Sequence, residues 1–152
     1  MNRTDLVQAL TSVCDNHGMA HQFEFADSEI SRIHRTAEGC NIEFSAALVS
    51  ARQANETPGR EPQRRYSNGL RLVLAPCPPA VAGEAQAFGL LASGWLQRGL
   101  QRLSVLPVPS DYQAEVLSLH LQFANGLQMQ LSGSSLRCEA SEQARQVEVL
   151  AC

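Results

Sequence analysis

The sequence predicts a mainly β protein: an antiparallel meander, a sandwich or a partly open barrel of seven or eight strands, with one N-terminal helix. Apolar residues recur at every second position in several segments, the connections between those segments are mostly short, and strands do not alternate with helices. The 152 residues, 44% apolar and 18% charged, suit a single domain over 1–152 with a core of its own.

The first expected element is a helix over about 4–17. Thr4 suits its N-cap, and Gly18 suits the position just after its end. Helical spacing places apolar side chains on one stripe, formed by Leu6, Val7, Leu10, Val13 and Cys14. We expect the helix to dock through this stripe.

From residue 21 onwards the apolar period changes to two, which predicts strands. Ile30 and Ile33 are three positions apart, so the strand over 29–36 carries a bulge or lies at a sheet edge. Gly94 permits another bulge just before Trp95. Short strands near Leu136 and in the tail are further candidates. The clearest strands are 21–26, 29–36, 41–48, 70–74, 86–98 and the two arms of 116–133.

The arms of 116–133 predict a hairpin for which two rules give different registers. A two-residue Asn125-Gly126 turn would set leucines opposite glutamines. A three-residue loop over 124–126, with Gly126 left-handed, gathers the apolar residues on one face instead. Each such side chain contributes about 1.5–3 kcal/mol when buried, so burial decides the register. The expected pairs are Leu119 with Leu131, Leu121 with Met129 and Phe123 with Leu127.

The opposite face of this hairpin carries only neutral polar residues. They are Ser118, His120, Gln122, Gln128 and Gln130. They do not form a recognisable catalytic set, so we interpret this face as scaffold.

The longest polar interruption lies at about 52–69, which we predict to be a mobile loop with a possible role in binding. It holds the main concentration of positive charge: Arg60, Arg64 and Arg65 next to Tyr66. Arginines bind carboxylates and phosphates through the guanidinium fork. These four residues are our candidate partner-binding residues.

Charge and hydropathy exclude several classes of function. The formal net charge is −3 and every basic residue is arginine, so nucleic-acid binding is not expected. The N-terminus lacks the apolar segment of a secretion signal, and no stretch approaches the roughly 18 apolar residues of a membrane span. We therefore expect a cytoplasmic protein. Its five cysteines form no C-x-x-C pair, and reduced thiols are expected.

Candidate reactive groups are scattered. Cys14, His17 and His21 have spacings that suit a metal ion, with Cys40 as a fourth ligand, but Cys14 belongs to the apolar stripe, and we expect no metal and no cofactor.

Two further arrangements suggest catalysis. Cys40 and His34 suggest a thiol-imidazole pair, which would need exposure and a positive environment. Glu24 and Glu43 would make an acid-base pair if they opposed one another across strands. Because both glutamates alternate with core aromatics, we favour a solvated outer face and a protein that is not an enzyme.

Three functions follow as hypotheses. The first is a non-catalytic module that binds a protein partner. The second is a small-ligand carrier or enzyme with an apolar pocket near Phe88 and Trp95. The third is a homo-oligomeric structural protein that pairs through an edge strand at 29–36.

One stretch carries a resemblance. Residues 99–136, G-L-Q-R-L-S-V-L-P-V-P-S-D-Y-Q-A-E-V-L-S-L-H-L-Q-F-A-N-G-L-Q-M-Q-L-S-G-S-S-L, combine hydrophobic alternation with the Asn-Gly turn. This stretch, about a quarter of the chain, resembles the C-terminal half of small uncharacterised bacterial all-β proteins. Some of these are similar to immunity proteins, which neutralise a toxin from a competing cell. The resemblance implies a cytoplasmic, non-catalytic, partner-binding protein and assigns no functional residue.

Overall fold

The computed structural model describes residues 19–53, 63–80, 83–140 and 146–148. These residues form a mainly β protein with ten strands and a short 3-10 turn, and no α-helix occurs among them. The helix predicted over 4–17 lies outside the described residues. The strands are β1 (Met19–Thr36), β2 (Gly39–Gln53), β3 (Gln63–Ser67), β4 (Leu70–Ala75), β5 (Gly89–Arg98), β6 (Gln101–Leu103), β7 (Val105–Pro107), β8 (Ser110–Phe123), β9 (Gln128–Ala140) and β10 (Gln146–Glu148); the turn is η1 (Glu84–Gln86).

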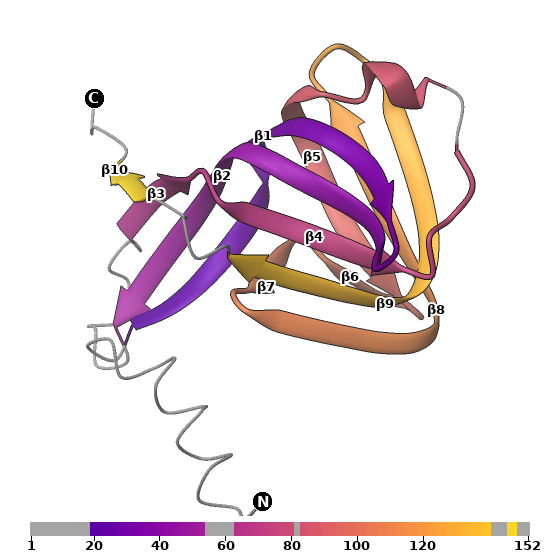
Figure 1. Cartoon of the computed structure of the whole chain (residues 1–152). Coiled ribbons are helices and arrows are strands. Elements are labelled where there is room, and N and C mark those ends of the chain that lie inside the picture. The colour runs from indigo at the N-terminus through magenta and orange to yellow at the C-terminus, as the bar shows by residue number, and fades with distance from the viewer. Residues whose placement is uncertain (1–18, 54–62, 81–82, 141–145, 149–152) are drawn as a thin grey trace, which may run out of the picture.

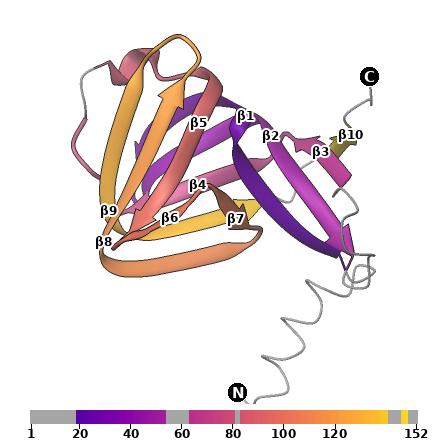
Figure 2. The same cartoon turned by 180° about the vertical axis from the view of Figure 1, so that it is seen from behind.

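Six strands close into a barrel in the order β1-β2-β4-β9-β8-β5, and β5 pairs again with β1 (Figures 1 and 2). All neighbouring strands are antiparallel. The mainly β antiparallel fold is thus confirmed, but the expectation of a partly open barrel was wrong, as was the strand number. The extra strands include β6, β7 and β10, which are three residues long and too short to show an alternating pattern.

The strands β1 and β2 are bent and serve two parts of the molecule. Their register shifts between Glu24 and Glu29, where Asp27 has a φ of 69°. Ser28 holds the bend, because its Oγ donates to Glu24 O at 2.7 Å and accepts from Leu48 N at 2.8 Å. The first residues of β1 and the last residues of β2 extend away from the barrel, with β3 and β10 beside them (Figure 1).

The barrel interior is filled with apolar side chains. Phe23 packs edge-on against Phe25 and Phe44, with ring centroids 4.8 and 5.0 Å apart. Leucines from β4, β5, β8 and β9 complete the cluster. A closed six-stranded barrel is narrow enough for side chains to fill it.

The β8–β9 hairpin confirms the predicted register. Leu119 pairs with Leu131 and Leu121 with Met129. Phe123 N donates to Leu127 O at 2.8 Å, which closes a three-residue loop, and Gly126 has a φ of +96°. Burial of the apolar face therefore outweighed the two-residue turn.

The segment over 52–69 differs from the mobile loop that we predicted. Residues 63–67 form β3, which pairs with β2 on one side and β10 on the other; residues 54–62 lie outside the described ranges. Short polar strands are missed because pairing with a neighbour, and not their own sequence, makes them extended.

Within the described ranges, none of the helical segments has the length and apolarity needed to cross a membrane.

Candidate functional site

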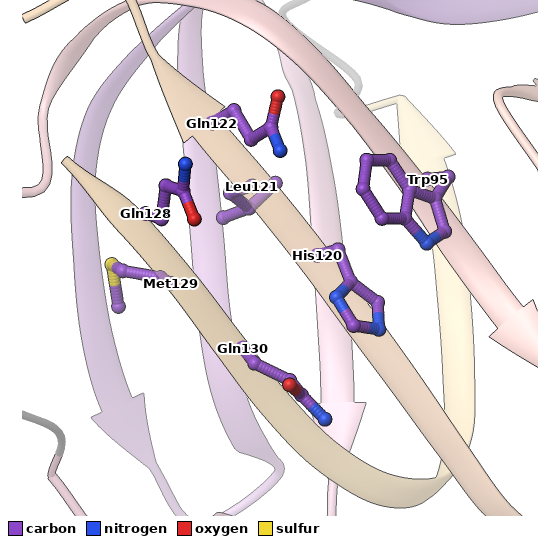
Figure 3. A pocket seen from close by; sticks show the side chains of 7 residues that line it. All are labelled: Trp95, His120, Leu121, Gln122, Gln128, Met129 and Gln130. Carbon is purple, nitrogen blue, oxygen red and sulfur yellow. The ribbon is translucent and has the colours of Figure 1, made fainter. Parts of the chain in front are cut away.

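The face that we interpreted as scaffold contains a hollow of about 240 Å³ on the outside of the barrel. Its lining side chains come from β5, β8 and β9 (Figure 3). We call this hollow the neutral site; it is lined by Trp95, His120, Gln122, Gln128 and Gln130, with Leu121 and Met129 beneath.

Strand register brings these residues together. Trp95 of β5 lies opposite His120 of β8, which in turn lies opposite Gln130 of β9. Gln122 lies opposite Gln128. Because side chains alternate across a strand, the residues next to buried leucines share the outer face.

A bulge and a close approach set the position of Trp95. The register of β5 shifts between Leu91 and Ser93, which reverses the faces of the residues that follow. The backbone of Gly94 then packs so closely on the core that an added Cβ would lie 3.0 Å from Phe25 Cβ. A bulge is therefore present before Trp95, as predicted, but it lies at Ala92 and not at Gly94; it turns the indole outwards.

Planar side chains stack in a row across three strands. The Trp95 and His120 rings are nearly parallel, 12° apart with centroids 4.8 Å apart. The guanidinium of Arg102, on β6, lies 4.8 Å from the centre of the Trp95 ring, a cation–π distance. Stacking pre-orders these side chains, so a partner that binds them loses less side-chain entropy.

The site is electrically neutral at its centre. Desolvation, and then the charge of Arg102, lower the pKa of His120, so its imidazole is uncharged at neutral pH. Within the described part of the chain, the buried Nε1 of Trp95 has no hydrogen-bond acceptor. An unsatisfied buried donor of this kind favours contact with a water molecule or a bound group.

Two amides of the site are oriented by neighbours. Ser93 Oγ donates to Gln122 Oε1 at 2.6 Å, and Gln130 Nε2 donates to Ser118 Oγ at 2.9 Å. Both bonds leave the other end of each amide able to bond to a ligand, and Gln128 is exposed. The arrangement therefore provides uncharged donors and acceptors next to an aromatic row.

The predicted partner-binding arginines do not form one cluster. Arg64, Arg65 and Tyr66 belong to β3, where alternation places Arg65 on the face opposite to the other two. Arg64 Nη2 donates to Glu24 Oε1 at 3.1 Å, so its charge is paired. Arg60 lies outside the described residues. The segment 63–67 is a strand and not part of a loop, and a role of these residues in binding a partner stays a prediction.

Phe88 and Trp95 do not lie together at the neutral site. Phe88 is 58% exposed and does not line the neutral site. Trp95 lies on the outside of the barrel among amides, so the residues do not enclose the apolar pocket that we predicted.

The thiol-imidazole pair is not formed. Cys40 lies opposite Arg35 and is fully buried, while His34 lies opposite Asn41. Burial raises the pKa of the Cys40 thiol to about 11, and His34 Nε2 bonds to Glu43 instead.

The two glutamates do not oppose one another, because Glu24 lies opposite Leu48 and Glu43 opposite Arg32. Both make ion pairs with arginines at the surface, as the solvated outer face predicted.

The metal candidates are only partly described. His21 belongs to β1, whereas Cys14 and His17 lie outside the described ranges. Among the described residues, there is no group of three or more histidines, cysteines and acidic residues that could hold a metal ion.

The strand over 29–36 contains the predicted bulge, because its register with β2 shifts around Ile30. It pairs with β2 along its length and with β5 at Glu29 and Ile30. Beyond that, Arg35 Nε donates to Pro78 O at 3.0 Å and its guanidinium pairs with Glu84. These are side-chain contacts, and β5 pairs only with the start of this segment, so self-pairing through it stays a prediction.

Sequence reasoning missed the neutral site because it assigned the polar face of the hairpin to solvent. The available signal was Trp95, the sole tryptophan. It lies on β5, which is next to β8 in the sheet and two strands from the glutamines of β9. Only the β5–β8 register shows that Trp95 meets His120.

Neither the protein-family models, the curated proteins nor the solved structures gave a match to this chain.

Proposed function

We propose that this protein is a non-catalytic module that binds a protein partner through the neutral site. The observation that carries the proposal is the row of Arg102, Trp95 and His120 beside amides. Interface centres are enriched in aromatic residues and arginine and depleted of other charges, and tryptophan and arginine are the commonest residues with large binding contributions.

A contrasting surface supports this choice. On the strands β1, β2, β4 and β9, and in the turn between β1 and β2, charged side chains of opposite sign pair with one another. We call this surface the charged face, formed by Arg32, Glu43, Arg71, Glu139, Arg137 and Glu38. A hollow of about 430 Å³ lies there, but its charged groups, Glu43 and Arg71, already have partners.

The chemistry of the neutral site favours binding over catalysis. Acid–base catalysis is often carried by more than one titratable group, whereas His120 is the only titratable side chain among the residues that line the neutral site, and its neighbours are an indole and amides. The buried thiols are poor nucleophiles because burial raises the pKa of Cys40 to about 11 and that of Cys138 to about 12.

The most concrete version of the proposal is an immunity protein that acts in the bacterial cytoplasm against a toxin. The resemblance over 99–136 motivates this version. Immunity proteins often present a charge opposite to that of the toxin's active site, and a net charge of −3 is compatible with a basic active site.

Co-purification tests the proposal. The tagged full chain, expressed in its native host, should retain a defined protein, and a toxin encoded next to its gene would support the immunity version. Trp95→Ala and Gln128→Ala should each weaken capture of that protein at least tenfold. Gln22→Ala is the matched control, because Gln22 is exposed on β1 and outside the neutral site. Equal capture by the Trp95 variant and the control would reject the site.

The hollow also favours a second candidate, a neutral small ligand such as an oligosaccharide, because hydroxyl groups bond to amides and to indole N–H. Calorimetric titration with a panel of neutral oligosaccharides distinguishes the two. Saturable binding that Trp95→Ala abolishes would select the small ligand, and no heat with any sugar would leave the protein partner.

A further inference from the structure

Two described arginines contact aromatic rings, whereas five others pair with carboxylates. Those five are Arg32, Arg35, Arg64, Arg71 and Arg137. Arg98 and Arg102 instead lie over aromatic rings, 5.4 Å from the centre of Tyr112 and 4.8 Å from that of Trp95. Neither has a carboxylate partner within the described ranges. Their positive charge is therefore not neutralised by an ion pair.

Both arginines flank the tip of the β5–β6 hairpin, which Figure 2 shows at the lower end of the barrel. Gln97 lies opposite Arg102, and Arg98 lies opposite Gln101. Gly99, with a φ of 60°, forms the turn with Leu100, and the Leu100 side chain is fully exposed. The tip therefore presents an exposed leucine between two arginines without a carboxylate partner; Arg98 Nη2 donates only to the amide oxygen of Gln101, at 3.0 Å.

The positions of Arg98 and Arg102 determine how large a ligand must be to contact both guanidiniums. Neighbouring strand positions point to opposite sides of the ribbon, so Arg102 lies on the Trp95 side and Arg98 on the Tyr112 side. A single carboxylate or phosphate cannot reach both guanidiniums. A protein surface that receives the tip in a recess can contact both, and it also covers Leu100.

We propose that the β5–β6 hairpin tip, formed by Arg98, Leu100 and Arg102, inserts into an acidic recess of the protein partner. The inference rests on the proposed function, because Arg102 covers Trp95 and makes the tip continuous with the neutral site. A guanidinium lying over a ring keeps its N–H donors at its edge for bidentate bonds to carboxylates. In the immunity version of the proposed function, the net charge of −3 faces a basic active site, so the acidic recess is a separate, local feature of the partner. It attracts only this pair of arginines, within about 8 Å.

A polyanion titration tests the charge of the partner. Wild type is titrated with poly-L-glutamate at about 50 mM salt by calorimetry, with Trp95 emission as a second readout because it is the sole tryptophan. Arg98→Gln with Arg102→Gln should weaken binding at least tenfold and reduce its salt dependence. The matched control, Arg32→Gln with Arg137→Gln, changes the net charge equally on the charged face and should change binding less than twofold.

Leu100→Glu provides a variant that a fold defect cannot explain, because the side chain is fully exposed. It places a carboxylate between the arginines and should weaken binding at least fivefold, whereas Leu100→Gln should retain most of it. Equal weakening by both arginine pairs would overturn the proposal. Tighter binding to double-stranded DNA than to poly-L-glutamate would also overturn it, in favour of a nucleic-acid partner.

The native partner separates this inference from the proposed function. If capture depends on Trp95 but is indifferent to salt and to the Arg98 and Arg102 pair, only the acidic recess is rejected. If capture is indifferent to Trp95 as well, the neutral site itself is rejected.

Discussion

Two cross-strand rows on the outside of the barrel obey the same geometry but differ in composition. In the charged face, Arg32 lies opposite Glu43, Glu43 opposite Arg71, and Arg71 opposite Glu139. In the neutral site, Trp95 lies opposite His120 and His120 opposite Gln130. The first row satisfies its charges internally, whereas the second leaves an indole N–H and amide groups to be satisfied from outside.

The difference shows how a β surface separates scaffold from recognition. Exposed ion pairs contribute little stability, about 0.2–1 kcal/mol each, but they occupy the donors and acceptors that a partner would need. Aromatic rings and amides carry no charge to be desolvated, so covering them costs less. Three predictions test this comparison, from the largest expected effect to the smallest.

The core beneath both rows should matter most to stability. Phe25→Ala removes a fully buried ring that packs on Phe23 and under Gly94. We expect a loss of about 3–5 kcal/mol in the free energy of unfolding, measured by urea denaturation, and loss of the Trp95–His120 stack in near-ultraviolet circular dichroism. A loss below about 1 kcal/mol would mean that the rows do not depend on this core.

Converting the neutral row into a charged one should remove binding without unfolding the protein. His120→Glu with Gln130→Arg builds an opposite-charge pair across β8 and β9, worth about 0.2–1 kcal/mol at most. Capture of the partner should fall at least tenfold, while the urea midpoint changes little. The reverse conversion, Glu43→Gln with Arg71→Gln, should leave capture unchanged; reduced capture there would assign binding to the charged face.

The two rows should lose stability in different pH ranges. The folded pKa of His120 is lowered, first by desolvation and then by Arg102. Because the unfolded state therefore binds the proton more readily, the contribution of His120 to stability is complete above about pH 6.5. It declines as the pH falls below that value. Desolvation opposes ionisation of Glu43, but bonds from Arg32 and His34 leave its pKa lowered. Its contribution is complete above about 4.5 and declines at lower pH.

Urea denaturation across pH 3–8 measures both effects. His120→Gln should flatten the decline that begins below about pH 6.5, and Glu43→Gln should flatten the decline below about pH 4.5. Identical profiles for wild type and His120→Gln would show that the imidazole is not held neutral by the fold.

Sequence reasoning succeeded where one burial pattern decided the outcome. In the β8–β9 hairpin, apolar alternation and a left-handed Gly126 predicted the register and the loop. It failed for β3, because the polar segment that contains Arg64, Arg65 and Tyr66 was predicted to be a mobile loop and is a strand. Extended backbone separates neighbouring side chains onto opposite faces, and pairing with β2 was not visible in the residues themselves.

The sequence by itself determined that the protein is mainly β and which face of the β8–β9 hairpin enters the core, because a period of two and burial energy act locally along each strand. Barrel closure and the meeting of Trp95 with His120 and Arg102 were decided only by the tertiary structure. Both depend on which strands become neighbours and in what register. That choice is made by the whole core at once, with a bulge in β5 and a glycine over Phe25 setting the final position of Trp95.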